Sequence, residues 1–415
     1  MKASFDYLIP NYARLPMVPV RGTGSWLWDA DGRRYLDFAA GVAVNTLGHC
    51  HPVMVQVLHE QSQKLIHCSN LYSIQEQAEL ARFLTDEVVG EPGKCFFCNS
   101  GAEANEALVK LARLYGNAAP ATDGSPRYEV LTFSKSFHGR TLATIAATEQ
   151  EKVRQGFAPY MPGFRYVPFN DPDALRAAIQ KETVALLVEP VQGEGGINVA
   201  TGAFLSALQE VCAKHDLLLM FDEVQCGLGR VGHPCGWKAA AAADGGPELK
   251  PDAVSWAKGL GGGFPIGGIW ASDRTVTGSD KKVSELLGPG KHGSTFGGSP
   301  LVSTLALAIQ REVKDKNLAA HAIEQGDYIK QVVATWTDTV ITDVRGLGLM
   351  LGFILQGEAP DGLTLSGHAQ HKLMAAGLLV VPAGPDVIRW LPPLNVSRDE
   401  IDQGLEIMKT ILTRD

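Results

Sequence analysis

The sequence predicts an α/β protein with a large domain built on a mostly parallel sheet and a smaller α+β domain. Between about residues 51 and 300, short apolar runs alternate with amphipathic segments. Several of these runs are apolar on both faces, which is typical of strands that helices cover on both sides. The length of 415 residues exceeds that of a typical single domain, so we expect two domains.

The large domain is predicted from five apolar runs with the length and composition of buried strands. Several are followed by glycine-containing loops and helical segments such as Phe204–His215. The predicted strands are Lys94–Cys98, Glu129–Phe133, Val184–Glu189, Leu217–Asp222 and Ala253–Ala257. In open sheets of this kind, ligands bind beyond the carboxyl ends of the strands.

The two ends of the chain complete the predicted organisation. An Asp31-Gly32 turn predicts a hairpin within Trp26–Asp37. The elements predicted after residue 300 are the helices Val302–Val313 and Ile323–Trp336, the strand Met350–Ile354, and a last helix from Arg398 to about Thr413 that a Ser397–Glu400 capping box opens. We therefore expect an N-terminal arm and hairpin (1–50) that packs with the small domain, a large domain (51–300) and a small C-terminal domain (301–415).

Composition and charge exclude several classes of protein. The net charge of -8 lacks the basic excess of a nucleic-acid binder. The sequence has no run of about 18 apolar residues, so no membrane helix is expected, and the first residues do not resemble a signal peptide. The seven cysteines are scattered and odd in number, which fits reduced thiols. We expect a cytoplasmic enzyme without nucleic-acid or membrane partners.

Lys258 is the first candidate for chemistry. It follows the predicted strand Ala253–Ala257 and precedes the glycine-rich Gly259–Gly263. A lysine at this position lies where α/β sheets bind ligands, and partial desolvation turns an amine into a nucleophile able to form a Schiff base. A surface lysine in a flexible loop and a phosphate-cradling glycine loop remain alternatives.

Asp222 ends another strongly apolar strand. A buried carboxylate is costly unless a cation or several donors satisfy it. A protonated pyridinium nitrogen is such a cation. A turn cap or a metal ligand is the alternative.

Two further segments have features of a ligand site. After the strand ending at Cys98, Ser100, Gly101 and Ala102 open a helix whose free N–H groups suit a phosphate, although a simple N-cap uses the same groups. Beyond the strand Glu129–Phe133, Phe137 could stack on a planar cofactor and Arg140 could pair with a carboxylate. A core ring and a surface arginine are the ordinary alternatives.

No metal site is expected. Cys95 and Cys98 form a C-x-x-C pair without a second such pair, and both lie in an apolar strand, so buried structural thiols are favoured. His49 and His51 flank Cys50, and a loop or helix-entry role is favoured for them.

Together these segments resemble the fold-type-I, class-III (ω-) aminotransferases, which depend on pyridoxal 5′-phosphate, over nearly the whole chain. The motifs that carry the resemblance are FFCNSGAEANEA (96–107), SFHGRT (136–141), EPVQGEGG (189–196), FDEVQCGLGRVG (221–232), KGLGGGFPIG (258–267) and HGSTFGG (292–298). Five or more such motifs in the order of the family are hard to obtain by chance. Cys226, where a threonine is usual, and Val231 depart from the pattern.

The resemblance implies a role for each matching residue. Lys258 would form the Schiff base and shuttle a proton, and Asp222 would pair with the pyridine nitrogen. The other implied cofactor contacts are Gln225 on the ring hydroxyl, Phe137 stacked on the ring, Ser100, Gly101 and Ala102 at the phosphate, and Thr295 from the neighbouring subunit. The implied substrate residues are Arg140, Glu194, Ser294 and Arg389. The site would therefore be shared in a homodimer.

Within the family, residues 11–29 and 41–52 look most like bacterial N²-acetylornithine aminotransferases. Val42 stands where ornithine δ-aminotransferases usually have a tyrosine, which favours an acylated substrate. The resemblance implies transfer from N²-acetylornithine to 2-oxoglutarate, giving N-acetylglutamate 5-semialdehyde and glutamate in arginine biosynthesis.

Several alternatives stay open. Succinylornithine, acetyl-lysine, succinyl-diaminopimelate, ornithine or 4-aminobutyrate could be the amine donor. A racemase or decarboxylase could use the same lysine and aspartate, but paired arginines for a dicarboxylate favour transamination. A non-enzymatic glycine-loop nucleotide-binding protein or a C-x-x-C metal protein is the remote alternative.

Overall fold

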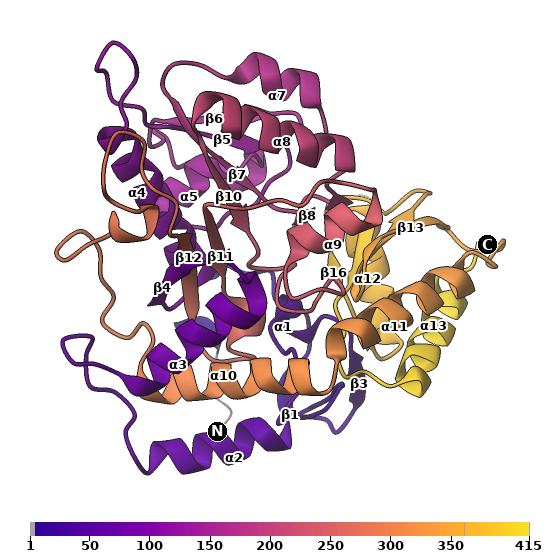
Figure 1. The fold of residues 1–415 in the computed structure, drawn as a ribbon. Coiled ribbons are helices and arrows are strands. Elements are labelled where there is room, and N and C mark those ends of the chain that lie inside the picture. The colour runs from indigo at the N-terminus through magenta and orange to yellow at the C-terminus, as the bar shows by residue number, and fades with distance from the viewer. Residues whose placement is uncertain (1–4, 361, 415) are drawn as a thin grey trace.

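The computed structural model describes residues 5–360 and 362–414. Its largest sheet has seven strands (Figure 1). Their order is β4 (Gly93–Cys98), β12 (Gly267–Ser272), β11 (Ala253–Trp256), β10 (Leu218–Asp222), β7 (Thr183–Val188), β5 (Glu129–Phe133) and β6 (Phe164–Val167). Only β12 runs antiparallel to its neighbours within this sheet. The prediction of an α/β fold with a mostly parallel sheet is therefore confirmed.

All five predicted strands belong to this sheet. Glu129–Phe133 matches the prediction, Val184–Glu189 is shifted by one residue at both ends, and the other three differ by one residue at one end. The sequence prediction lacked β6 and β12. Strand β12 begins with Gly267 and Gly268, which weaken its strand pattern. A Cβ atom at Gly268 would lie 2.9 Å from the Phe97 ring, so these glycines allow β12 to pack closely beside β4.

The sheet buries both faces, as the apolar runs predicted. Along β10, Leu219 and Phe221 belong to the core cluster that includes helix α8 (Gly202–His215). The alternate residues Leu218 and Met220 belong to the cluster that includes helix α4 (Gly101–Ala118). Successive strand residues point to opposite faces, so the two helices cover opposite sides of the sheet (Figure 1).

The C-terminal part contains an antiparallel sheet. Its order is β13 (Ile341–Leu347), β14 (Met350–Leu355), β17 (Val387–Trp390) and β16 (Val381–Pro382). Three helices share its apolar cluster: α11 (Leu318–Val333), α12 (Leu365–Ala375) and α13 (Arg398–Ile411). The predicted helix Ile323–Trp336 corresponds to α11, but both ends differ: α11 begins directly after Asn317, whose φ is 51°, and ends at Val333. The capping box of α13 at Ser397 and Glu400 is confirmed.

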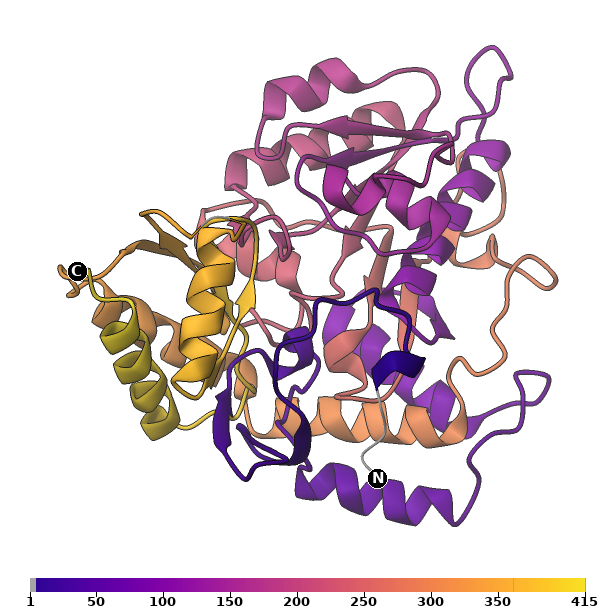
Figure 2. The same cartoon turned by 180° about the vertical axis from the view of Figure 1, so that it is seen from behind.

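The N-terminal hairpin joins residues from the far end of the chain. Strands β1 (Pro19–Thr23), β2 (Trp26–Asp29), β3 (Arg34–Asp37) and β15 (Leu378–Leu379) form one sheet in this order, with β3 and β15 parallel. Figure 2 shows the hairpin beside the C-terminal part. Helix α10 (Pro300–Asp315) contributes side chains to the cores of both parts. The division into residues 1–50, 51–300 and 301–415 remains our proposal.

The remaining elements are short or peripheral. They are η1 (Phe5–Tyr7), α1 (Ala40–Ala43), α2 (Pro52–Ser62), α3 (Gln75–Phe83), the π-helix η2 (Leu84–Val89), α5 (Leu142–Ala147), α6 (Glu151–Arg154), α7 (Pro172–Ala178), β8 (Val191–Gln192), β9 (Asn198–Val199), α9 (Gly236–Ala243), η3 (Lys258–Leu260) and η4 (Val283–Glu285). Among the described residues, none of the helices combines the length and apolar character that a membrane crossing needs.

The cysteine and histidine segments have structural partners. Burial raises the pKa of both Cys95 and Cys98 to about 12, so these thiols stay protonated. His49 Nε2 lies 2.8 Å from Asp37 Oδ2, and His51 directly precedes helix α2. In the described parts of the chain, no three His, Cys, Asp or Glu side chains gather in a way that could hold a metal ion.

Candidate active site

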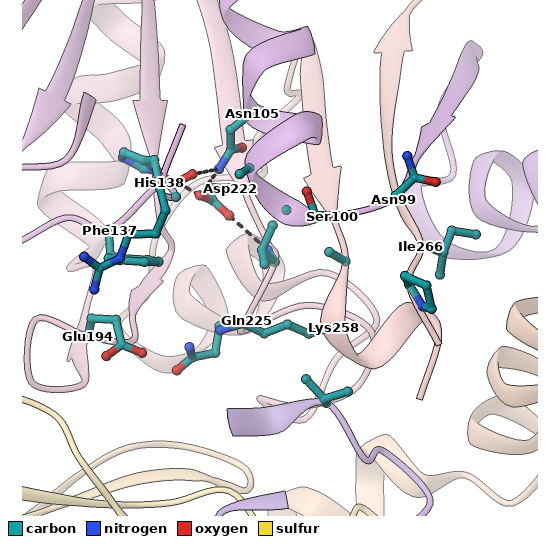
Figure 3. Close-up of a pocket in the computed structure, with 18 of the residues that line it drawn as sticks. Asn99, Ser100, Asn105, Phe137, His138, Glu194, Asp222, Gln225, Lys258 and Ile266 are labelled. Atoms are coloured by element: carbon teal, nitrogen blue, oxygen red, sulfur yellow. Dashed lines mark hydrogen bonds and ion pairs between the residues drawn. The ribbon is translucent and has the colours of Figure 1, made fainter. Parts of the chain in front are cut away.

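The carboxyl ends of strands β10 and β11 open into a pocket. Asp222 ends β10, and Lys258 follows the neighbouring parallel strand β11. The pocket has a volume of about 620 Å³. Nine residues predicted from the sequence line it: Ser100, Gly101, Ala102, Phe137, Arg140, Glu194, Asp222, Gln225 and Lys258. Figure 3 labels Ser100, Phe137, Glu194, Asp222, Gln225 and Lys258 among them. The fold thus brings together side chains from five separate motifs.

Lys258 has the properties of a reactive amine. Its side chain enters the pocket from a backbone with a φ of 43°, a left-handed conformation that costs energy for a non-glycine residue. Loss of hydration lowers the pKa of Lys258 to about 8, although the charge of Glu194 partly opposes this shift. A substantial fraction of the amine is therefore uncharged, and nucleophilic, slightly above neutral pH.

Asp222 is held by a network of polar side chains. Its Oδ2 accepts a hydrogen bond from Asn105 Nδ2 at 2.7 Å and lies 2.8 Å from His138 Nδ1, and its Oδ1 accepts from the backbone N–H of Val224 at 3.0 Å. Ser255 Oγ donates to Asn105 Oδ1 at 2.7 Å. Burial alone would lower the pKa of His138, but Asp222 raises it above the usual value. The carboxylate is thereby oriented into the pocket (Figure 3).

Sequence reasoning did not single out Asn105 or His138. Both lie within motifs that were recognised, but Asn105 is inside helix α4 and His138 lies beside the more conspicuous Phe137 and Arg140. A polar residue on an otherwise apolar helix face was the one local signal for Asn105, since Leu108 and Val109, three and four residues further on, are buried. Its partner could not be read from the sequence.

The start of helix α4 forms another wall of the pocket. Ser100 caps this helix, with its Oγ accepting from the N–H of Glu103 at 3.2 Å. The first-turn residues Gly101 and Ala102 also line the pocket, and first-turn N–H groups have no partner within a helix. A Cβ atom at Gly101 would lie 2.8 Å from Val224 Cγ1, so the glycine allows this close approach. The arrangement suits an anion such as a phosphate.

Arg140 and Phe137 also line the pocket, on a segment that packs against the start of helix α4. Arg140 is exposed, with its Cζ 5.5 Å from the centre of the Phe137 ring. Within the described chain, no ion pair includes Arg140, so its guanidinium is available to a ligand carboxylate. Glu189, which sequence reasoning missed, accepts from the N–H groups of Phe137 at 3.0 Å and Gly193 at 3.3 Å. Burial raises the pKa of Glu189 to about 7.

Arg389 lies behind the pocket wall. It is on strand β17 and its side chain is fully buried. Its Nη1 donates to Glu194 Oε1 at 2.8 Å and to Gln225 Oε1 at 2.6 Å. Although burial by itself raises the pKa of Glu194, Arg389 holds it below the usual value. Glu194 and Gln225 line the pocket and therefore separate the Arg389 guanidinium from it, so that Arg389 could bind a ligand only after Glu194 moves.

Ser294 and Thr295 do not line the pocket of their own chain. Thr295 is exposed. Ser294 Oγ accepts from Asn99 Nδ2 at 3.1 Å and from the N–H of Gly297 at 3.0 Å, which places it near the rim. Cys226 and Val231, the two departures from the family pattern, are buried in an apolar cluster outside the pocket. The roles predicted for Ser294 and Thr295 stay predictions.

The sequence profile of the family Aminotransferase class-III matches residues 7–412. This chain belongs to the class-III aminotransferases. The match spans nearly the whole chain, and this membership confirms the family resemblance found in the six motifs. The enzyme is thus an aminotransferase, and the pocket at the carboxyl ends of β10 and β11 is its candidate active site.

The alignments with individual relatives cover almost the full length of both chains. The acetylornithine aminotransferase of Caldanaerobacter subterraneus subsp. tengcongensis is 42% identical over 98% of this chain and 97% of its own length. That of Agrobacterium fabrum is 44% identical, over 96% and 94%. Among solved structures, the ornithine aminotransferase of Toxoplasma gondii, described with partial occupancy of PLP at its active site, has a TM-score of 0.87 at 30% identity over 98% of this chain and 92% of its own. The N-acetylornithine aminotransferase of Stenotrophomonas maltophilia has a TM-score of 0.78 at 34% identity, over 96% of each chain.

Proposed function

We propose that this class-III aminotransferase binds pyridoxal 5′-phosphate and transfers the terminal amino group of N²-acetylornithine to 2-oxoglutarate. The products are N-acetylglutamate 5-semialdehyde and glutamate, and the enzyme serves arginine biosynthesis in the cytoplasm. The observation that carries the proposal is a pair of arginines in different states at one pocket. Arg140 is free of ion pairs within the described chain, whereas Arg389 is neutralised by Glu194.

The residues of the pocket fit the cofactor. The first turn of helix α4, at Gly101 and Ala102, would hold the phosphate, and Phe137 would stack on the ring. Asp222, oriented by Asn105 and His138, would pair with the protonated ring nitrogen. When bound, the cofactor supplies an aldehyde that reacts with amines and a ring that withdraws electrons from the reacting carbon.

The side chains of the protein handle the proton and the substrate. Lys258, with a pKa of about 8, would take the proton from the substrate carbon that carries the amine. It would then deliver this proton to the aldehyde carbon, C4′, of the cofactor. Lys258 lines the same pocket as Asp222, Gln225 and Arg140. Arg140 would bind the carboxylate at the distal end of the substrate and so set which carbon faces Lys258.

The two arginines explain how one pocket serves two unlike substrates. N²-acetylornithine reacts through its terminal amine and has one carboxylate, which Arg140 would bind. Glutamate reacts through its α-amine and brings a second carboxylate close to the reacting carbon. Arg389 would bind that second carboxylate after Glu194 moves aside. While acetylornithine is bound, Glu194 stays paired with Arg389, because an unpaired buried guanidinium is unfavourable.

Sequence similarity, rather than similarity of the fold, favours an acylated donor over ornithine. The T. gondii ornithine aminotransferase has the higher TM-score of the two solved structures, so overall shape does not separate the substrates. Relatives that carry the name acetylornithine aminotransferase are 39–44% identical. Val42 packs against the apolar cluster that contains Val191, Met350 and Val387, and it offers no hydroxyl to an unacylated α-amine.

The homodimer is part of the proposal. Thr295 is exposed and lies outside its own pocket, as expected of a residue that reaches the phosphate in a second subunit. Each pocket would then be completed by the partner chain, and an isolated subunit would bind the cofactor less tightly.

A screen of half-reactions tests the proposed donor. The pyridoxal form of the purified enzyme is mixed separately with N²-acetylornithine, succinylornithine, acetyl-lysine, succinyl-diaminopimelate, ornithine and 4-aminobutyrate, and the loss of its visible absorption is followed. We expect the highest kcat/KM for N²-acetylornithine, and Lys258→Ala is the inactive control. A higher kcat/KM for another amine would show that this amine, and not N²-acetylornithine, is the preferred donor. A purified protein without visible absorption after incubation with pyridoxal phosphate would contradict the cofactor.

A further inference from the structure

Arg230 is a buried arginine without a carboxylate partner. Only 3% of the residue is exposed, and no ion pair in the described part of the chain includes it. Its Nη1 donates to two backbone carbonyl oxygens, those of Leu349 at 3.1 Å and Pro392 at 2.5 Å. Burial lowers the pKa of Arg230 to about 9. A buried cation with neutral partners is costly, so this contact calls for a role beyond stability.

The two carbonyl groups flank strand β17, which carries Arg389, and its neighbour β14. Leu349 directly precedes strand β14, and Pro392 lies two residues beyond the end of strand β17. The two strands are antiparallel neighbours, with Gly352 opposite Arg389. The N–H of Leu349 also donates to the carbonyl oxygen of Arg230 at 3.0 Å. One guanidinium thus holds both strands at the end nearest Arg389.

The other side of Arg230 adjoins the active site. Arg230 follows Gln225 by five residues, and both line a small cavity together with Glu223, Ala257 and Gly259. This cavity has a volume of about 10 Å³, which leaves room for about one water molecule. The guanidinium therefore connects the loop after Asp222, which bears Gln225, to the C-terminal sheet.

The contact between these two parts is close. A Cβ atom at Gly348 would lie 2.8 Å from the carbonyl oxygen of Arg230 and 2.7 Å from the carbonyl carbon of Val231. Gly348 has a φ of 52°, which favours glycine as well. The turn between β13 and β14 is thus packed directly on the loop after Gln225, and Arg230 is the side chain that crosses this junction to Pro392.

We propose that Arg230 is a positioning residue that sets the place of Arg389 relative to Lys258 and thereby tunes recognition of the dicarboxylate substrate. The inference rests on the proposed function, in which Arg389 binds the second carboxylate of glutamate and 2-oxoglutarate. A small displacement of a binding group costs a large factor in rate or affinity, so loosening Arg230 weakens this half of the reaction. The acetylornithine half does not use Arg389 as a ligand and is spared.

Arg230→Met is the test variant. Methionine keeps the length of the side chain and removes the cost of burying a charge, while the carbonyl groups of Leu349 and Pro392 lose this donor, so folding is checked by circular dichroism before the assays. We expect the KM for 2-oxoglutarate and glutamate to rise about tenfold, with the KM for the acylated amine unchanged. Arg230→Lys should restore part of the loss, since an ammonium group still donates to a carbonyl. The dissociation constant of glutarate, an unreactive dicarboxylate, should rise in parallel and provides a measure independent of turnover.

Arg127→Met is the matched control. Arg127 is also buried and also donates to backbone carbonyls, those of Ala119, His215 and Asp216. Unlike Arg230 it has a carboxylate partner, Asp216 Oδ2 at 3.2 Å, so its replacement should cost at least as much stability, but it contacts neither strand β14 nor β17. Its replacement should leave the ratio of the two KM values unchanged. Equal losses in both half-reactions of Arg230→Met, or a ratio like that of Arg127→Met, overturn the proposal. If Arg230→Met does not fold, the same comparison with Arg230→Lys decides.

Arg389→Lys separates this inference from the function on which it rests. If Arg389→Lys leaves dicarboxylate recognition intact, the role proposed for Arg389 fails, and the inference about Arg230 fails with it. If Arg389→Lys weakens glutarate binding selectively while Arg230→Met does not, only the role of Arg230 is overturned.

Discussion

Replacing Glu194 by alanine should shift the balance between the two half-reactions. In the wild-type chain, Glu194 neutralises the fully buried Arg389 at 2.8 Å. In Glu194→Ala, glutamate or 2-oxoglutarate can restore a carboxylate to Arg389, whereas acetylornithine brings its methylene chain against an unpaired guanidinium. The variant should therefore lose activity with acetylornithine and keep or gain activity with glutamate.

The magnitude follows from the surroundings of the pair. Removing one partner of a fully buried ion pair costs about 3–5 kcal/mol. Here 28% of the Glu194 side chain is exposed, and Gln225 Oε1 still accepts from Arg389 at 2.6 Å. Both features reduce the penalty, to about 2 kcal/mol. The ratio of kcat/KM for glutamate to that for acetylornithine should thus rise about thirtyfold.

Single-turnover absorption measurements on each half-reaction test this directly. Glu194→Gln is the matched control, because it keeps the size and one acceptor oxygen of the side chain while removing the charge, and its ratio should fall between those of the wild type and Glu194→Ala. Arg389→Ala should shift the ratio the other way, by about 2–5 kcal/mol. Equal losses in both half-reactions for Glu194→Ala and Arg389→Ala would refute the gate.

Four further outcomes are expected. Lys258→Ala should abolish turnover, and borohydride reduction of the wild type should attach the cofactor to Lys258 and to no other residue, as peptide mapping can show. Mixing Lys258→Ala with Thr295→Ala, which loses a phosphate donor worth about 1.5–3 kcal/mol, should restore about one working site per mixed dimer; verified heterodimers without activity would mean that each site lies within one chain. Asn105→Ala should weaken cofactor binding about tenfold or more in a fluorescence titration, because Asp222 loses a charge-assisted hydrogen bond, and an unchanged dissociation constant would contradict that role. Lys258→Met should raise the Tm of the cofactor-free chain most near pH 7, and this gain should shrink between pH 8 and 10.5. In that range the folded wild type holds Lys258 uncharged while the unfolded chain still binds the proton, so the stability of the wild type rises with pH. A gain in Tm that does not change with pH would show that the pKa of Lys258 is not lowered.

Local pattern was enough to identify much of this protein. Lys258 and Asp222 were recognised because each ends an apolar strand, and the carboxyl ends of neighbouring parallel strands meet at one edge of a sheet. The last helix was found from its capping box, which involves residues three apart. Strand β6 was missed because it is an edge strand of partly buried residues whose apolar run is broken by Arg165, and β12 because it begins with glycines.

Other features were decided by tertiary structure alone. Asp222 and Asn105 are 117 residues apart, and Arg389 lies 195 residues from Glu194. No periodicity relates such residues, because a pattern fixes which face of an element is buried but not which partner covers it. The sequence by itself determined the family and the approximate strand ends, and it indicated Lys258 as the candidate reactive lysine. Packing decided that Glu194 and Gln225 cover Arg389, and that Arg230 joins the site loop to the strands behind it, since buried polar groups take their partners from whatever backbone and side chains the closed core brings within reach.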